Sequence, residues 1–132
     1  MYKHILVPLD LGDIGAAEQA INHAKHIARR DGSRISVISV VPAWPAQELR
    51  QIPHDYQPDL DSYIDAVREG LDIKGEIKVG GSISGRIIET IVAKGIDLVV
   101  MASHDPRFTD YLIGSNAAHV VLHAPCSVLV VR

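Results

Sequence analysis

The residues best suited to chemistry in this chain surround a polar loop that runs from Ser103 to Ile113 and ends at Gly114-Ser115-Asn116. A helical pattern follows, and the first N–H groups of a helix have no partner within it. These N–H groups, together with the positive end of the helix dipole, favour an anion such as a phosphate group. Capping of the helix by the side chain of Ser115 or Asn116 explains the same residues, so both interpretations stay open at this point.

A carboxylate occupies a second promising position, at the end of a short apolar run. Asp10 directly follows Ile5–Leu9, which has the length and composition of a buried strand. Pro8 cannot donate a hydrogen bond within a central strand, so we expect the strand to leave the sheet there. At such a strand end Asp10 either accepts hydrogen bonds from sugar hydroxyls or caps a turn or helix.

The glycine-rich segment Gly80 to Arg86 invites comparison with a P-loop, because two glycines have four residues between them. A P-loop also needs a lysine that reaches the phosphates and a serine or threonine that binds magnesium. Arg86 and Ile87 occupy those two positions. We therefore interpret the segment as a tight turn followed by a helix that Ser84 caps.

Seven histidines and one cysteine raise the question of metal or thiol chemistry. His119 with His123 and His23 with His26 have helical spacing, but neither pair has a third ligand in view, and exposed helix positions explain both. Cys126 precedes an apolar run and is expected to be buried and unreactive. We therefore expect no metal site and assign no catalytic residue.

The composition narrows the classes of protein. Lys and Arg number 13 against 16 Asp and Glu, and the net charge of −3 lacks the basic surplus of a nucleic-acid-binding protein. No apolar run approaches the roughly 18 residues of a membrane helix, and the first residues lack the pattern of a signal peptide. A single cysteine allows no intramolecular disulfide. We expect a soluble, cytoplasmic protein that binds neither nucleic acid nor membranes.

Hydrophobic periodicity predicts that strands and helices alternate along the chain. The expected strands, short apolar runs rich in β-branched residues, are Ile5–Leu9, Ile35–Val41, Glu76–Val79, Leu98–Ala102 and Val128–Val131. The expected helices have apolar residues at helical spacing: Ala17–Ala28 with Gly32 as C-cap, Leu60–Leu71, Ser84–Lys94, and a last helix from Gly114 with Ala117, Val121 and Ala124 on its apolar side. Four prolines between residues 42 and 58 predict an irregular surface loop over Ala43–Pro58.

This alternation predicts an α/β fold in which an open parallel sheet carries helices on both faces. The length favours one domain over residues 1–132. Ligands of such sheets bind beyond the carboxyl ends of the strands, where the strand order reverses. Here those ends are Pro8-Leu9-Asp10 and Met101-Ala102-Ser103-His104.

The sequence resembles the universal stress protein family in four segments. They are Pro8-Leu9-Asp10, Leu98–His104, Gly114–Ala118 and His123–Val131. The resemblance covers essentially the whole chain, and residues 102–132 resemble the UspF/UspG-type branch of the family. It implies a Rossmann-like, five-stranded parallel sheet in the order 3-2-1-4-5, with ATP or AMP bound where the strand order reverses.

The loop departs from the usual ATP-binding pattern of that family, which is glycine, two residues, glycine, nine residues, glycine, then serine or threonine. Ala102 and Asp105 stand where the first two glycines belong, eight residues separate Asp105 from Gly114, and only Gly114-Ser115 matches. A carboxylate at Asp105 repels phosphate unless a divalent cation intervenes or Arg107 pairs with it. The UspF/UspG-type branch shares this altered loop and is still associated with nucleotide.

The resemblance and the residue chemistry together assign roles around a bound ATP or AMP, with or without Mg²⁺. Asp10 is assigned to the ribose hydroxyls. Val40, Val41 and Met101 are assigned to the adenine ring, although the valines could equally be ordinary core residues. The expected nucleotide-binding residues, which lie at strand ends or in and after the polar loop, are Pro8, Leu9, Asp10, Val40, Val41, Met101, Ala102, Ser103, His104, Arg107, Gly114, Ser115 and Asn116.

Three classes of function compete with simple nucleotide binding. An efficient ATPase lacks support, because no Walker lysine, acid pair for two metals or nucleophile with its base is evident; slow hydrolysis stays open. A response-regulator receiver needs an aspartate at the end of the third strand, where this chain has Gly80-Gly81. A nucleotide-free dimeric scaffold of the UspA type, acting only through protein partners, is the main alternative.

The last strand predicts self-association. Residues 127–132 form an edge strand so apolar that we expect it to pair with its copy in a second subunit, and the resemblance implies the same dimer. Whether the dimer doubles to a tetramer stays open, and the loop 43–58, which carries Trp44, is the expected additional contact or lid. We predict a homodimeric stress protein in which bound adenine mononucleotide biases a loop conformation or the choice of partner.

Overall fold

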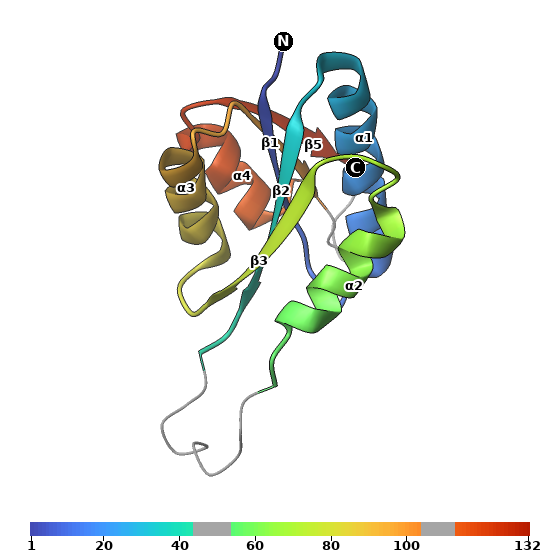
Figure 1. Cartoon of the computed structure of the whole chain (residues 1–132). Coiled ribbons are helices and arrows are strands. Elements are labelled where there is room, and N and C mark those ends of the chain that lie inside the picture. Colours follow the sequence, from blue (N-terminus) through green and yellow to red (C-terminus); the bar gives the residue numbers. More distant parts are fainter. Residues whose placement is uncertain (44–53, 104–112) are drawn as a thin grey trace.

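The computed structural model describes residues 1–43, 54–103 and 113–132 (Figure 1). In these ranges the elements alternate in the order β1 (His4–Pro8), α1 (Ile14–Asp31), β2 (Arg34–Val41), α2 (Gln57–Val67), β3 (Ile73–Val79), α3 (Ile83–Lys94), β4 (Leu98–Ala102), α4 (Ser115–His123) and β5 (Ser127–Val131). The strands form one parallel sheet in the order β3-β2-β1-β4-β5. The predicted α/β fold and strand order are confirmed.

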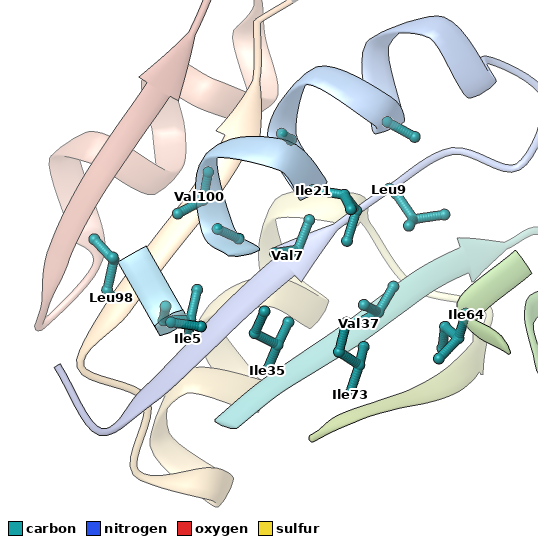
Figure 2. Close-up of a cluster of buried hydrophobic side chains, with 14 of the residues drawn as sticks. Ile5, Val7, Leu9, Ile21, Ile35, Val37, Ile64, Ile73, Leu98 and Val100 are labelled. Atoms are coloured by element: carbon teal, nitrogen blue, oxygen red, sulfur yellow. The ribbon is translucent and has the colours of Figure 1, made fainter. Parts of the chain in front are cut away.

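Side-chain alternation along the central strand β1 divides the core into two layers. Ile5 and Val7 pack with α1 and α2, where Ile64 belongs to the same cluster (Figure 2). Leu6 faces the opposite side and packs with Ile87 of α3. Because β1 is covered on both faces, its sequence is a continuous apolar run rather than an alternating one. Each such buried side chain stabilises the fold by roughly 1.5–3 kcal/mol.

The helix ends follow local capping rules, with one correction to the prediction. Gly32 and Gly95 end α1 and α3 in the left-handed conformation, at φ 73° and 64°. The cap of α3 is Ser82, not Ser84: the Ser82 hydroxyl accepts a hydrogen bond from the Gly85 N–H at 3.1 Å. Ser82 has the extended backbone that an N-cap requires, whereas Ser84 already lies inside the first turn.

The region around α2 differs most from the prediction. The helix begins at Gln57, inside the segment expected to be irregular, because Pro58 in the first turn needs no N–H partner. It ends at Val67 rather than Leu71, since Glu69 and Gly70 adopt positive φ. Strand β3 begins at Ile73 instead of Glu76.

Two smaller corrections concern the last helix and the strand bounds. Val121 was expected on the apolar side of α4, but it is 45% exposed, and Val120 is buried with Ala117 instead. The strands β1, β2 and β5 each begin one residue earlier than expected. Among the described residues, no helix is both long and apolar enough to cross a lipid bilayer.

Candidate functional site

The chain turns sharply away from the sheet after β1, as Pro8 suggested. The Leu9 N–H still donates to the Ile38 carbonyl of β2 at 2.9 Å, and a turn follows. The Asp10 Oδ1 accepts from the Gly12 N–H at 2.8 Å, and the Asp10 carbonyl accepts from the Asp13 N–H at 3.0 Å. Asp10 thus supports a turn and does not cap the helix, since Asp13 is the N-cap of α1.

A cavity of about 410 Å³ lies at the carboxyl ends of β1, β2 and β4, next to the first turns of α1, α3 and α4. This volume falls within the range of small-molecule sites. The expected site residues that the structure brings together on its walls are Pro8, Leu9, Asp10, Val40, Met101, Ala102 and Asn116. They come from three strand ends and the start of α4, as the strand-order reversal requires.

The other expected residues have different positions. Val41 is half-buried and does not line the cavity, and its carbonyl accepts from the Gly80 N–H at 2.8 Å. Ser103, Gly114 and Ser115 lie beside the cavity without forming its walls. His104 and Arg107, like Asp105, fall in the loop 104–112, outside the described residues.

Within the described residues, no side chain caps the start of α4. Gly114 is the N-cap, and neither Ser115 nor Asn116 caps the helix, so the capping interpretation is wrong. The N–H of Gly114 itself donates to the Ser103 Oγ at 2.9 Å. No described side chain caps the N–H groups that follow, and such groups at the start of a helix favour an anion.

The backbone conformation at position 114 does not require a glycine. Its φ of −58° and ψ of 152° suit any residue. The nearest described atom to an added Cβ would be the Ser103 Oγ at 3.8 Å, which is ordinary van der Waals contact. A glycine that neither backbone nor packing requires is typical of places where a ligand approaches the main chain closely.

Sequence reasoning missed half of the cavity walls: Asp13, Ala16, Ala17, Ile38, Pro42, Ile83 and Ile87. Asp13 could have been found, because a carboxylate just before a helix at a strand end faces the ligand side of such a sheet. Ile83 and Ile87, which share one face of α3, could not have been found from the sequence, because their position at the cavity depends on how α3 packs over the sheet. Among the described residues no lysine or arginine lines this cavity.

The P-loop-like segment is a structural turn. Gly80 and Gly81 have positive φ, at 77° and 80°. The guanidinium of Arg86 folds back and donates to the carbonyls of Gly80 and Val79 at 2.9 and 2.8 Å. The interpretation of this segment as a tight turn is confirmed, and Arg86 holds the end of β3.

The histidines and the cysteine that the structure describes form no metal-binding cluster. The rings of His119 and His123 are tilted by 44° with their centroids 4.4 Å apart. The described residues hold no group of three or more histidine, cysteine, aspartate or glutamate side chains that could bind a metal ion. Cys126 is half-buried. Burial, with a smaller contribution from Asp97, raises the pKa of its thiol, which disfavours the reactive thiolate.

These features define a Rossmann-like α/β protein with a cavity where the strand order reverses. The model of the universal stress protein family matches residues 1–132, so the chain belongs to this family. Universal stress protein G of Salmonella typhimurium is 32% identical over 147 aligned residues that cover all of both chains.

Solved structures of the family share the fold. Universal stress protein UspA from Lactobacillus plantarum superposes with a TM-score of 0.71 at 28% identity, over 99% of this chain and 98% of that one. The universal stress protein from Archaeoglobus fulgidus in complex with dAMP gives a TM-score of 0.74 at 21% identity, over 99% and 98% of the two chains.

Proposed function

We propose that this protein binds an adenine mononucleotide, ATP or AMP, in the cavity at the carboxyl ends of β1, β2 and β4. The observation that carries the proposal is the pairing of a partly apolar cavity of small-molecule size with a helix start that no described side chain caps. The apolar part suits a base, and the free N–H groups of α4 suit phosphate. The dAMP complex of the Archaeoglobus fulgidus relative supports the ligand class.

The residues around the cavity fit the parts of such a ligand. Ile38, Val40 and Met101 offer apolar surface to an adenine ring. One carboxylate oxygen of Asp10 holds the turn, and the other can accept hydrogen bonds from ribose hydroxyls. Gly114, with the N–H groups that follow it, would meet the phosphates. Positive charge, which the described cavity walls lack, would come from Arg107 or a divalent cation such as Mg²⁺.

We further propose that bound nucleotide acts as a regulatory signal in a stress-response protein, by setting the conformation of the loop after β4 and thereby the choice of partner. Ser103 at the end of β4 connects the two parts of this proposal. Its Oγ contacts the start of α4, and its N–H donates to the Val131 carbonyl of β5 at 2.9 Å. A ligand that changes Ser103 would therefore act directly on the last strand.

Homodimerisation through residues 127–132 is part of this proposal. Strand β5 is the sheet edge, and Val128, Leu129 and Val130 are only half-buried in the single chain. An apolar edge with unpaired N–H and C=O groups favours pairing with a second copy. We expect Leu129→Asp to give monomers or insoluble protein in light scattering coupled to gel filtration, whereas a well-behaved dimer would contradict this interface.

The second candidate function is a nucleotide-free dimeric scaffold, which the absence of lysine and arginine from the described cavity walls favours. One experiment separates the two. Freshly purified protein is denatured, released small molecules are identified by mass spectrometry, and AMP and ATP-Mg²⁺ are titrated calorimetrically into the emptied protein. Released adenine nucleotide with micromolar affinity supports the first function. If no nucleotide is released and no titration heat is observed, the nucleotide-free scaffold is the supported function.

A further inference from the structure

A second hollow, of about 280 Å³, lies at the opposite end of the sheet, where β1 and β2 begin and α3 ends. We call it the basic pocket; its lining residues are His4, Arg34, Ile35, Ser36, Asp72, Lys74 and Lys94. Three cationic side chains face one carboxylate, an excess of two positive charges. The cavity proposed for nucleotide shares none of these residues.

The strand register gathers these side chains on one face. His4 pairs with Arg34 across β1 and β2, and Ser36 pairs with Lys74 across β2 and β3. Because side chains alternate, all four point to the side of the sheet that Leu6 and α3 occupy. Lys94, in the last turn of α3, reaches the same hollow.

Two of the three cations have no acidic partner in the described part of the chain. Lys94 lies 3.8 Å from Glu76, whereas Arg34 and Lys74 form no salt bridge there. Lysines on an edge strand commonly guard against aggregation, and Lys78, which pairs with Glu76 at 3.1 Å, fits that role. Arg34 lies on the interior strand β2, so edge protection does not explain it.

The floor of the basic pocket is a buried polar pair. His4 is 7% exposed, its Nε2 lies 2.6 Å from the Ser36 Oγ, and no described atom forms a hydrogen bond with its Nδ1. Burial lowers the pKa of His4, and the positive charges of Arg34 and Lys94 lower it further. The Lys94 carbonyl and Asp97 act in the opposite direction without reversing the shift. The positive charges around the pocket thus add to the effect of burial on the pKa of His4.

We propose that the basic pocket binds a small oxyanion of the phosphate class. A phosphate dianion matches the excess of two positive charges, and its oxygens accept charge-assisted hydrogen bonds from Arg34, Lys74 and Lys94. The Asp72 carboxylate limits the affinity and disfavours larger polyanions. This site is independent of the proposed nucleotide function, because the two cavities lie at opposite ends of the strands.

Nuclear magnetic resonance of the labelled full chain tests the proposal. Inorganic phosphate should shift the His4 ring and the Lys74 amide with saturation in the millimolar range, and sodium chloride at equal ionic strength should not. Sulfate, whose charge is constant near neutral pH, should raise the pKa of His4, because a bound anion favours the imidazolium. Non-saturating shifts, or equal shifts with chloride, would overturn the proposal.

Matched variants localise the site. Lys74→Gln should weaken phosphate binding about tenfold. Lys78→Gln, on the same strand and face but outside the pocket, should leave it unchanged. If both variants lose the same phosphate affinity, the effect reflects only the overall charge of the protein, and the proposed site is refuted. A titration with AMP identifies the source of the phosphate group. If AMP competes with phosphate at Lys74, the natural ligand is a phosphate ester; if it does not compete, the ligand is free phosphate. Either result requires that the pocket binds the phosphate class.

Discussion

The two ends of the parallel sheet offer an anion different kinds of binding group. Each helix returns against the direction of its strand, so helix N-termini gather at the carboxyl ends of the strands and helix C-termini at the amino ends. The carboxyl-end cavity can therefore use main-chain N–H groups and carries no described cation. The amino end faces helix carbonyls, so the basic pocket depends on side-chain charge from Arg34, Lys74 and Lys94.

This difference predicts that main-chain access decides binding at the carboxyl end, and the largest effect should come from Gly114→Val. Its branched side chain would stand where a phosphate approaches the start of α4. We expect about a hundredfold loss of AMP affinity by calorimetry, about 2.7 kcal/mol. Circular dichroism should show an unchanged fold, since the space beside Gly114 admits a Cβ. Unchanged affinity in the folded variant would contradict the assignment.

A side-chain contribution at the same end should be smaller. Asp10→Asn keeps an oxygen that can accept from the Gly12 N–H, so the turn survives, but it removes the charge offered to ribose hydroxyls. We expect about tenfold weaker AMP binding, as for loss of a charge-assisted hydrogen bond. Asp61→Asn on the exposed face of α2 is the control. If the two variants lose the same AMP affinity, the assignment of Asp10 to the nucleotide site is contradicted.

At the amino end, His4 should affect how the free energy of unfolding depends on pH. The folded-state pKa of His4 lies below its unfolded value of 6.5, so its contribution is complete above pH 6.5 and declines as pH falls through the folded-state pKa. Each unit of difference corresponds to about 1.4 kcal/mol. Urea unfolding from pH 7.5 downward should show this decline in the parent protein and less of it in His4→Gln. Identical pH profiles would contradict the burial of a neutral His4.

The smallest expected effect concerns competition within the carboxyl end. The Ser103 Oγ already accepts from the Gly114 N–H, which a phosphate oxygen would otherwise use. Ser103→Ala should therefore strengthen AMP binding a few fold, within about 1 kcal/mol. Ser103→Thr keeps the hydroxyl and should change affinity little. Weaker binding in the alanine variant would mean that Ser103 contacts the ligand instead of competing with it.

Sequence reasoning succeeded where local rules decide the structure. Leu98–Ala102 was predicted with its observed bounds, because an apolar run between Asp97 and Ser103 leaves little choice. Gly32 was recognised as a helix end because few residues tolerate the left-handed conformation. The strand ends that form the carboxyl-end cavity followed from the same strand pattern.

What the sequence did not reveal depends on long-range register. The hydrogen bond between His4 and Ser36 joins residues that are distant in sequence, and it exists only because β1 and β2 align His4 with Arg34. The same holds for Ile87 on the cavity wall, which the packing of α3 places there. The choice of Ser82 over Ser84 as cap turned on backbone conformation, which two serines so close in sequence do not distinguish.

The most direct test of this contrast between the two ends is a map of amide shifts in labelled protein as AMP is added. We predict saturable shifts around Asp10, Met101 and Asn116 at the carboxyl end, which are lost in Gly114→Val. Shifts confined to the amino end, around Arg34 and Lys74, or the absence of saturable shifts anywhere, would contradict nucleotide binding where the strand order reverses.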